Sequence, residues 1–235
     1  MVSLFEPKHE MKEELTNFLG QYLSENKRLL IEKVLHERTR HVTVVLEDIY
    51  QSQNGSAVIR TCECMGLQDV HVVETTSKYA TNKKVLKGSH KWMDIVRHNK
   101  RNADNLVACF DHLKTNGYRI YVTDPAGGLS IDEVPVDQKI ALVMGNELRG
   151  ASPAAVAMAN ERVTIPMYGF TESLNISVSA AICLHAIMPR LRASDVHWHL
   201  AEEEKALLRY QWYKKCLRNA DLLEKEFWKR QPAAR

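Results

Sequence analysis

Three polar segments of this chain adjoin apolar runs, and their side chains could bind or position a reactant. The richest of them is 165–179. Pro166 ends a strand-like run there, and Gly169 permits a tight turn. Ser173 and Asn175 then place short hydrogen-bonding groups where a helix-like run begins. Because Ser and Asn are common helix N-caps, this segment alone fits an ordinary capped helix better than it fits a binding site.

The second segment, 145–150, follows the continuous apolar run 139–144, which is typical of a buried parallel strand. In α/β sheets, ligands bind beyond the carboxyl ends of such strands. Gly145 and Gly150 would let the backbone approach a ligand there, and Glu147 would supply a carboxylate. A tight turn before the next helix explains the same residues. The G-x-G-x-x-G and G-x-x-x-x-G-K-S/T patterns do not occur in the sequence, which weakens a nucleotide-binding oxidoreductase as an alternative.

The third segment also follows a strand-like run and centres on Asn54 and Arg60. Asn54-Gly55 predicts a turn, with Ser56 capping a helix over 56–66. Arg60 would then lie on the first turns of that helix, where it and the free N–H groups could form a phosphate-binding corner. Taken alone, an arginine on a helix is usually a solvated surface residue.

In this order and at these separations, the segments closely resemble the three motifs of the SpoU, or TrmH, family of ribose 2′-O-methyltransferases within the SPOUT superfamily. The resemblance covers about 42–192. It rests on Asn54-Gly55-x-x-x-x-Arg60, Gly145-Asn146-Glu147-x-x-Gly150, and Ile165-Pro166 leading to Ser173-Leu174-Asn175-x-Ser177. The long flanks at both ends also fit the branch that modifies the D-loop of tRNA, as does Gly88-Ser89-His90-Lys91-Trp92.

The resemblance implies S-adenosylmethionine-dependent methylation of a ribose 2′-hydroxyl in tRNA, at a guanosine of the D-loop. The residues that it implies for the cofactor are Thr123, Met144, Gly145, Asn146, Gly150, Ile165, Met167 and Leu174. It makes Arg60 the catalytic arginine, with a reacting centre shaped by Asn54, Glu147, Ser173 and Asn175. The same reaction on ribosomal RNA stays open as an alternative, as does a non-catalytic RNA-binding or assembly module.

Arg60 is a costly general base. Deprotonating a guanidinium with a pKa of ~12.5 at pH 7 takes roughly 7.5 kcal/mol. We therefore expect Arg60 to bind the phosphate beside the target ribose and to polarise its hydroxyl, with the proton leaving through phosphate or water, or through Arg60 only transiently.

Alternating apolar runs and helical segments predict a parallel α/β sheet flanked by helices. The expected strands are 41–47, 70–74, 95–98, 118–123, 139–144 and 162–165, and the expected helices are 56–66, 102–116, 153–160 and 176–191. We expect two short helices in the first 38 residues and a helical segment over about 200–230. The resemblance adds a C-terminal deep trefoil knot over about 120–192 and a homodimer whose site is completed across the interface. The implied domains are an N-terminal helical extension over 1–40, the SPOUT methyltransferase domain over 41–195, and a C-terminal helical extension over 196–235.

Charge is distributed unevenly along the chain. Between positions 78 and 101 there are eight Lys and Arg residues and one Asp, a net charge of +7, whereas the whole chain carries +3 and the remainder therefore −4. Such a cluster favours an RNA-binding surface. The residues that we expect to contact RNA are Lys83, Lys84, Lys87, His90 and Lys91. Trp92 fits a stacking surface and a core position about equally well, and the lysines could also form a solvated face.

The remaining composition points to a cytoplasmic protein without a metal. No apolar run reaches the 18 residues that suggest a membrane span, and the first residues do not read as a signal peptide. The five cysteines read as reduced thiols. Cys62-x-Cys64 on a helix and the His197/His199 pair lack further ligands nearby, so we expect no metal site.

Overall fold

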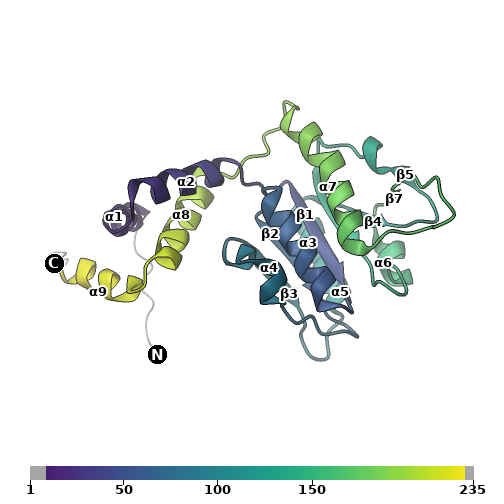
Figure 1. The fold of residues 1–235 in the computed structure, drawn as a ribbon, viewed down its shortest axis with the longest axis horizontal. Helices are drawn as coiled ribbons and strands as arrows, with labels where there is room; N and C mark the ends of the chain where they lie inside the picture. The colour runs from purple at the N-terminus through teal and green to yellow at the C-terminus, as the bar shows by residue number, and fades with distance from the viewer. Residues whose placement is uncertain (1–8, 231–235) are drawn as a thin grey trace. The chain divides into compact units, whose positions relative to one another are not determined.

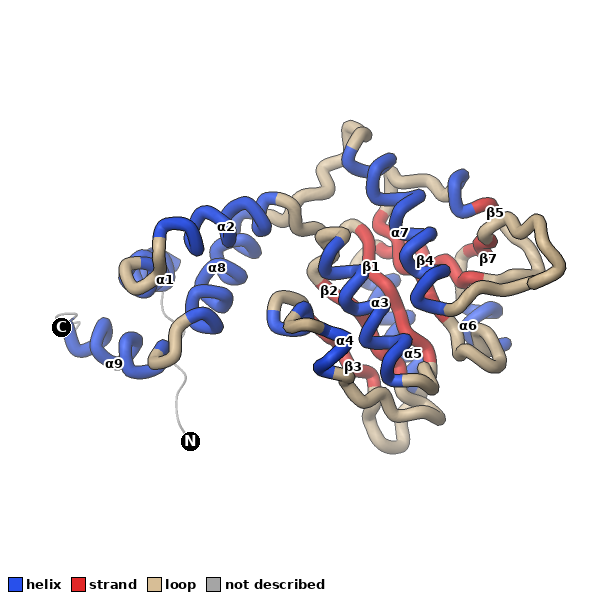
Figure 2. Tube along the Cα trace, viewed as in Figure 1, coloured by secondary structure: helices blue, strands red, loops and turns tan. Residues whose placement is uncertain are grey.

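The computed structural model describes residues 9–230 of the 235-residue chain. They form two compact units, 39–199 and a second made of 9–38 with 200–230. The larger unit is built on the strands β1 (Val42–Glu47), β2 (Asp69–Val73), β3 (Asp94–His98), β4 (Tyr118–Thr123), β5 (Leu129–Ser130), β6 (Lys139–Met144) and β7 (Glu161–Thr164). They pair in parallel throughout, in the order β3-β2-β1-β6-β4-β7-β5. Figures 1 and 2 show this sheet with β3 and β5 toward its two ends.

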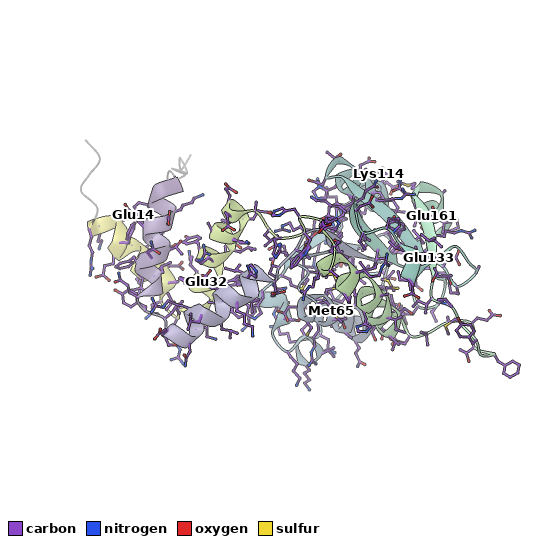
Figure 3. The ribbon with its side chains drawn as sticks, turned by 90° about the horizontal axis from the view of Figure 1, so that it is seen from above. Glu14, Glu32, Met65, Lys114, Glu133 and Glu161 are labelled. Carbon is purple, nitrogen blue, oxygen red and sulfur yellow. The ribbon has the colours of Figure 1, made fainter. Side chains whose placement is uncertain are left out.

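Helices cover both faces of this sheet. One face carries α3 (Ser52–Cys64) and α7 (Ile176–Arg192), and the other carries α5 (Asn105–Thr115) and α6 (Pro153–Met158) (Figure 1). Figure 3 shows the two layers: Lys114, near the end of α5, and Met65, just after α3, lie on opposite sides of the sheet. All six residues of β1 are buried, as expected for a parallel strand covered on both faces.

Most predicted elements of the larger unit are confirmed with small shifts at their ends. The elements that the sequence did not predict are β5, the single helical turn α4 (Lys83–Leu86), and short 3₁₀ turns at Ser89–Lys91 and Ile131–Glu133. Elements of two to four residues are too short to show a hydrophobic period, so the pattern did not reveal them.

The predicted turn at Asn54-Gly55 is wrong, and so is Ser56 as the helix cap. Helix α3 begins at Ser52 with Gln51 as its N-cap, which places Asn54, Gly55 and Ser56 inside the helix and buried. Gly55 serves close packing instead of a turn, because a Cβ there would lie 2.7 Å from Cε2 of Tyr79. The Ser56 hydroxyl is hydrogen-bonded to the Tyr79 hydroxyl at 2.8 Å and anchors the loop before α4.

The smaller unit is helical, as predicted, with α1 (His9–Gly20), α2 (Glu25–His36), α8 (Glu202–Cys216) and α9 (Ala220–Arg230). The single C-terminal segment expected from the sequence is thus two helices. Leu19, Leu35 and Trp212 are almost fully buried in this unit, and Arg209 pairs with Glu32 through two hydrogen bonds of 2.6 and 2.7 Å. Within 9–230, no helix combines the length and the apolar character needed to cross a lipid bilayer.

The strand order brings the polar segments of the sequence to one edge of the sheet. Because every strand is parallel, the carboxyl ends of β1, β4, β6 and β7 lie together. After β1, the chain adds β2 and then β3 on one side of that strand. The later strands β4 and β6 lie on the other side of β1, so the direction in which strands are added to the sheet reverses there. Ligand sites of open α/β sheets occur at such points.

Candidate functional site

A cavity of about 630 Å³ lies at the carboxyl ends of β4, β6 and β7. Its wall includes every residue predicted for the cofactor, which are Thr123, Met144, Gly145, Asn146, Gly150, Ile165, Met167 and Leu174. It also includes Asn54, Glu147, Ser173 and Asn175, four of the five predicted reacting-centre residues. Three segments separated by as many as 121 residues in sequence therefore meet at one site.

The loop after β6 is held in shape by Asn146. Its backbone N–H donates to the Gly150 carbonyl at 2.9 Å and its carbonyl accepts from the Gly150 N–H at 2.8 Å. The Asn146 side chain accepts from the Leu148 N–H at 2.9 Å and donates to the Asp48 carbonyl at 2.7 Å. A Cβ at Gly145 would lie 2.1 Å from the Ala151 nitrogen. Gly145 is therefore needed because the loop closes on itself at this point. From the sequence, a glycine here was expected to let the backbone approach a ligand.

Glu147 crosslinks this loop to the start of α3. One carboxylate oxygen accepts from the Tyr50 N–H at 2.8 Å, and the other accepts from the Gln51 N–H at 3.1 Å and the Asn54 side-chain amide at 3.1 Å. The N-cap residue of α3, Gln51, makes no capping hydrogen bond with its own side chain. Glu147 instead accepts from the N–H of the N-cap residue itself, and its negative charge lies at the positive end of the helix dipole.

The third motif joins the same network through Asn175. Its side-chain amide donates to the Asn54 side-chain oxygen at 3.2 Å. Its own side-chain oxygen accepts from the Ser177 N–H at 2.9 Å, which makes Asn175 the N-cap of α7. A continuous chain of hydrogen bonds therefore runs from Glu147 through Asn54 to Asn175 and fixes the starts of α3 and α7 relative to the loop after β6.

The environment of Glu147 favours its ionised form. Partial burial raises the pKa of its carboxyl group, but the hydrogen bonds from Tyr50, Asn54 and Gln51 outweigh that effect, and the net pKa is lowered. Both carboxylate oxygens accept hydrogen bonds, so Glu147 is poorly placed to take a proton.

Arg60 lies apart from this cavity in the single chain. It is exposed on α3 and does not line the cavity wall. Six residues separate it from Asn54, which places the two about 120° apart around the helix. The expected phosphate corner at the helix start is wrong, because α3 begins at Ser52, so Arg60 lies roughly 12 Å along the axis from it. The N–H groups of Tyr50 and Gln51 at that start already bind Glu147.

The loop between β7 and α7 is the most exposed part of the site. Ser173 is exposed, Leu174 and Met167 are each 37% exposed, and the aromatic side chains of Tyr168 and Phe170 are almost fully exposed. The apolar side chains of Ile165, Leu174 and Val163 nevertheless contribute to the cavity wall. This loop thus combines an apolar wall with a free outer surface.

The basic segment presents its predicted residues at the surface of the same unit. Lys83 and Lys84 are exposed on α4, Lys87 is exposed in a left-handed conformation at its end, and Lys91 is exposed on the next 3₁₀ turn. His90 and Trp92 are half-buried. None of these residues lines the cavity, so the segment forms a separate basic surface.

Several groups of the site gave no sequence signal. The N–H groups of Tyr50 and Gln51 are backbone donors, which side-chain motifs do not reveal. Asp48 accepts from the N–H groups of Thr75 and Thr76 at 2.7 and 2.8 Å and ties the loop after β1 to the loop after β2. Further cavity residues outside the motifs include Asp124, Arg149, Val163, Thr164 and Glu172.

Metal-ligating residues gather away from the predicted candidates. Cys62 is buried and Cys64 exposed on the same helix, so Cys62-x-Cys64 does not converge. His71, His98 and Cys109 instead bring three ligand atoms within 4.8 Å of one another. Their sequence spacing matches no familiar metal motif, so the sequence alone does not predict that they meet. The expectation of no metal site rested on Cys62-x-Cys64 and the His197/His199 pair and did not consider these three residues.

The fold and the cavity define an α/β protein with a ligand site beyond the carboxyl ends of parallel strands. Residues 41–185 match the model of the SpoU rRNA Methylase family, and the chain belongs to that family. Its parallel sheet with flanking helices is the SPOUT fold.

Known proteins agree with this assignment. The tRNA (guanosine(18)-2′-O)-methyltransferase of Borreliella burgdorferi is 40% identical over 207 residues, covering 88% of this chain and 93% of that protein. The crystal structure of the A. aeolicus TrmH/SpoU tRNA modifying enzyme has a TM-score of 0.71 and 30% identity, covering 82% of this chain and 98% of that one. The SpoU methyltransferase AviRb from Streptomyces viridochromogenes, in complex with the cofactor AdoMet, shares the fold at 19% identity with a TM-score of 0.54, covering 69% of this chain and 62% of that one.

Proposed function

We propose that this chain transfers a methyl group from S-adenosylmethionine to the ribose 2′-hydroxyl of guanosine 18 in the D-loop of tRNA. The observation that carries the proposal is the single cavity in which the three family motifs meet through the Glu147–Asn54–Asn175 network. The high coverage of the Borreliella relative supports tRNA as the substrate class.

The cavity has the size and the lining for the cofactor. Its volume of about 630 Å³ falls within the range of roughly 300–1,000 Å³ of small-molecule sites. Ile165 and Leu174 offer apolar side chains to flank an adenine, and the loop from Met144 to Gly150 offers backbone groups for the ribose. When bound, S-adenosylmethionine supplies a methyl group on a positively charged sulfonium.

The residues around the cavity position the reactants. Glu147 holds the start of α3 against the loop after β6, and Asn54 and Asn175 hold the start of α7 against both. In our proposal Ser173, exposed at the mouth, faces the substrate ribose. Arg60 binds the adjacent phosphate through its planar guanidinium and polarises the hydroxyl, whose proton leaves to phosphate or water. The rate gain then comes chiefly from orientation.

A second copy of the chain would bring Arg60 to the cavity. Arg60 is exposed and lies outside the cavity wall of its own chain. Helix α7 packs beside α3 and exposes Val178 and Ile182 by 45% and 37%. Apolar side chains on one helix face favour burial against a partner. We therefore propose a homodimer through α7, with Arg60 completing the site of the other protomer.

The chain path and domain limits belong to the same proposal. We propose a deep trefoil knot over about 120–192, which is supported by the match of residues 41–185 to the SpoU rRNA Methylase family. We propose a methyltransferase domain over 41–195, with helical extensions over 1–40 and 196–235. The division of the described chain into two compact units, with boundaries after residues 38 and 199, supports these limits.

Methyl transfer to separated RNA pools tests the proposal. The protein is incubated with labelled S-adenosylmethionine and either unmodified tRNA or unmodified ribosomal RNA, and methylated riboses are mapped by nucleotide. The proposal predicts label in tRNA at guanosine 18. Label in ribosomal RNA alone would show that the substrate is ribosomal RNA and not tRNA. No transfer to either pool would favour a non-catalytic RNA-binding module.

A further inference from the structure

We infer that His71, His98 and Cys109 form a binding site for a zinc-class divalent metal ion between the sheet and α5, separate from the methyl-transfer cavity. None of the three residues lines that cavity. Their potential ligand atoms, one from each side chain, all lie within 4.8 Å of one another.

The fold places the three side chains on one face of the sheet. His98 of β3 is paired in register with Val73 of β2, and Val73 lies two residues after His71. Side chains two residues apart share a face of a strand, so both imidazoles project from the face that α5 covers. Cys109 projects toward this face from α5, where it is buried in the same apolar cluster as Val73.

The spacing of the ligand atoms is close to that of a tetrahedral site. Nδ1 of His71 and Nε2 of His98 are 3.0 Å apart. In a tetrahedral zinc site with Zn–N of about 2.0–2.1 Å and Zn–S of about 2.3 Å, ligand atoms lie roughly 3.3–3.7 Å from one another. Small side-chain rotations would therefore bring the three ligand atoms to tetrahedral zinc spacing. The fourth position would be left to water, beside His112, whose ring centroid lies 5.5 Å from that of His71.

A carboxylate already orients the first ligand. Nε2 of His71 lies 3.3 Å from Oδ2 of Asp69, and Arg40 lies 3.2 Å from the other oxygen of that carboxylate. Asp69 is almost fully buried. With the Nε2 proton of His71 held by Asp69, Nδ1 of His71 presents its lone pair toward His98. A carboxylate behind a histidine ligand is the usual outer partner of protein metal sites.

The ligand chemistry selects the class of metal. Two imidazoles and one thiolate suit Zn²⁺, whereas Mg²⁺ and Ca²⁺ require oxygen ligands. A buried histidine pair alone would account for the contact between His71 and His98, but it does not require a thiol at the same point. On binding, the Cys109 thiol releases one proton to solvent, and the proton shared between the imidazoles moves to Nδ1 of His98, leaving Nε2 free for the metal.

Cobalt and zinc binding to the untagged full chain tests the inference. One equivalent of Co²⁺ should give a sulfur-to-cobalt charge-transfer band with the intense visible bands of four-coordinate cobalt, and Zn²⁺ should bleach them. Zinc X-ray absorption should give one sulfur at about 2.3 Å and nitrogen at about 2.0–2.1 Å. Wild-type protein without a charge-transfer band, or zinc without a sulfur neighbour, would overturn the site.

Variants localise the signal. Cys109→Ser should abolish the charge-transfer band, whereas Cys183→Ser, a matched control at an equally buried cysteine outside the cluster, should keep it. If Cys109→Ser keeps the charge-transfer band, the assignment is overturned. It is also overturned if Cys183→Ser loses the band while Cys109→Ser keeps it. If serine at 109 unfolds the chain, His98→Ala serves instead, because His98 is only half-buried. It should weaken zinc affinity at least tenfold, and unchanged affinity would overturn the site.

Discussion

At the scale of single residues, Glu147 explains why separated motifs act as one site. It comes from the loop after β6, yet its carboxylate binds the backbone just before α3 and holds Asn54, which in turn accepts a hydrogen bond from Asn175. The sequence predicted that these residues belong together but assigned Glu147 no such bond. A carboxylate that accepts hydrogen bonds from backbone 96 or 97 residues away leaves no local sequence pattern.

Replacing Glu147 with Gln should destabilise the protein at neutral pH by about 0.5–1.5 kcal/mol, because an amide offers fewer acceptors to the three donors now bound and water can replace part of the loss. The pKa of Glu147 is lowered in the folded chain. Its ionised form therefore contributes stability above the unfolded pKa of about 4.3, and that contribution is lost as the pH falls through the folded value. Urea unfolding at several pH values should show the difference between wild type and variant shrinking below pH ~4.

Glu172→Gln provides the control for that experiment. Glu172 also lines the cavity, but it is exposed. Its replacement should change stability by no more than about 0.5 kcal/mol. An equal loss of stability in both variants would contradict the role of Glu147 in holding the start of α3. A Glu147→Gln effect on stability that does not depend on pH would contradict it as well.

Arg60 carries the catalytic part of the proposal. Arg60→Ala should lower single-turnover methyl transfer by about a hundredfold, because the phosphate next to the reacting ribose is no longer positioned. Arg60→Lys should also be impaired, since an ammonium lacks the planar fork that binds two phosphate oxygens. Cofactor affinity should be unchanged in both variants. Near-normal transfer by either variant would remove Arg60 from catalysis.

At the scale of elements, the hydrophobic pattern predicted the long strands and helices well and failed where tertiary contacts set the boundaries. Asn54-Gly55 has the composition of a turn, yet α3 runs through it because Glu147 holds Gln51 and Asn54 at the helix start and Gly55 makes room for Tyr79. Helix α4 is a single turn capped by Asn82, and a segment of that length carries no period. The cavity was predictable as a set of residues, whereas its hydrogen bonds were not.

The basic segment around α4 should act through phosphate contacts. Changing Lys83, Lys84 and Lys87 together to Glu should weaken tRNA binding and flatten its dependence on salt, because fewer counterions are released. Filter binding over a range of salt concentrations measures both effects. The same positions changed to Arg keep the charge and should keep the affinity. Unchanged tRNA affinity in the Glu variant would exclude this segment from the RNA surface.

At the scale of the whole molecule, the apolar face of α7 should hold two chains together. Ile182→Asp should convert a particle of twice the 26.9 kDa chain mass into a monomer and abolish methyl transfer, because Arg60 then reaches no cavity. Sedimentation equilibrium and the transfer assay on the same sample measure both. Ala108→Asp, an exposed control on α5, should leave the mass unchanged. A wild-type monomer that still methylates would contradict the shared site.

The parallel sheet follows from the sequence, because buried parallel strands read as continuous apolar runs. The order β3-β2-β1-β6-β4-β7-β5 does not follow from such runs, since they specify burial and not neighbours. The same limit hid the meeting of His71, His98 and Cys109, which depends on β2, β3 and α5 packing together.

Methyl transfer to two matched tRNA transcripts tests the central claim most directly. One transcript carries guanosine at position 18 and the other carries 2′-deoxyguanosine there, with all other nucleotides identical. With S-adenosylmethionine and wild-type protein, we predict one methyl group on the ribose of guanosine 18 in the first transcript and none on the second. Transfer to the deoxy transcript, to a base, or to a different nucleotide would contradict ribose 2′-O-methylation at this position.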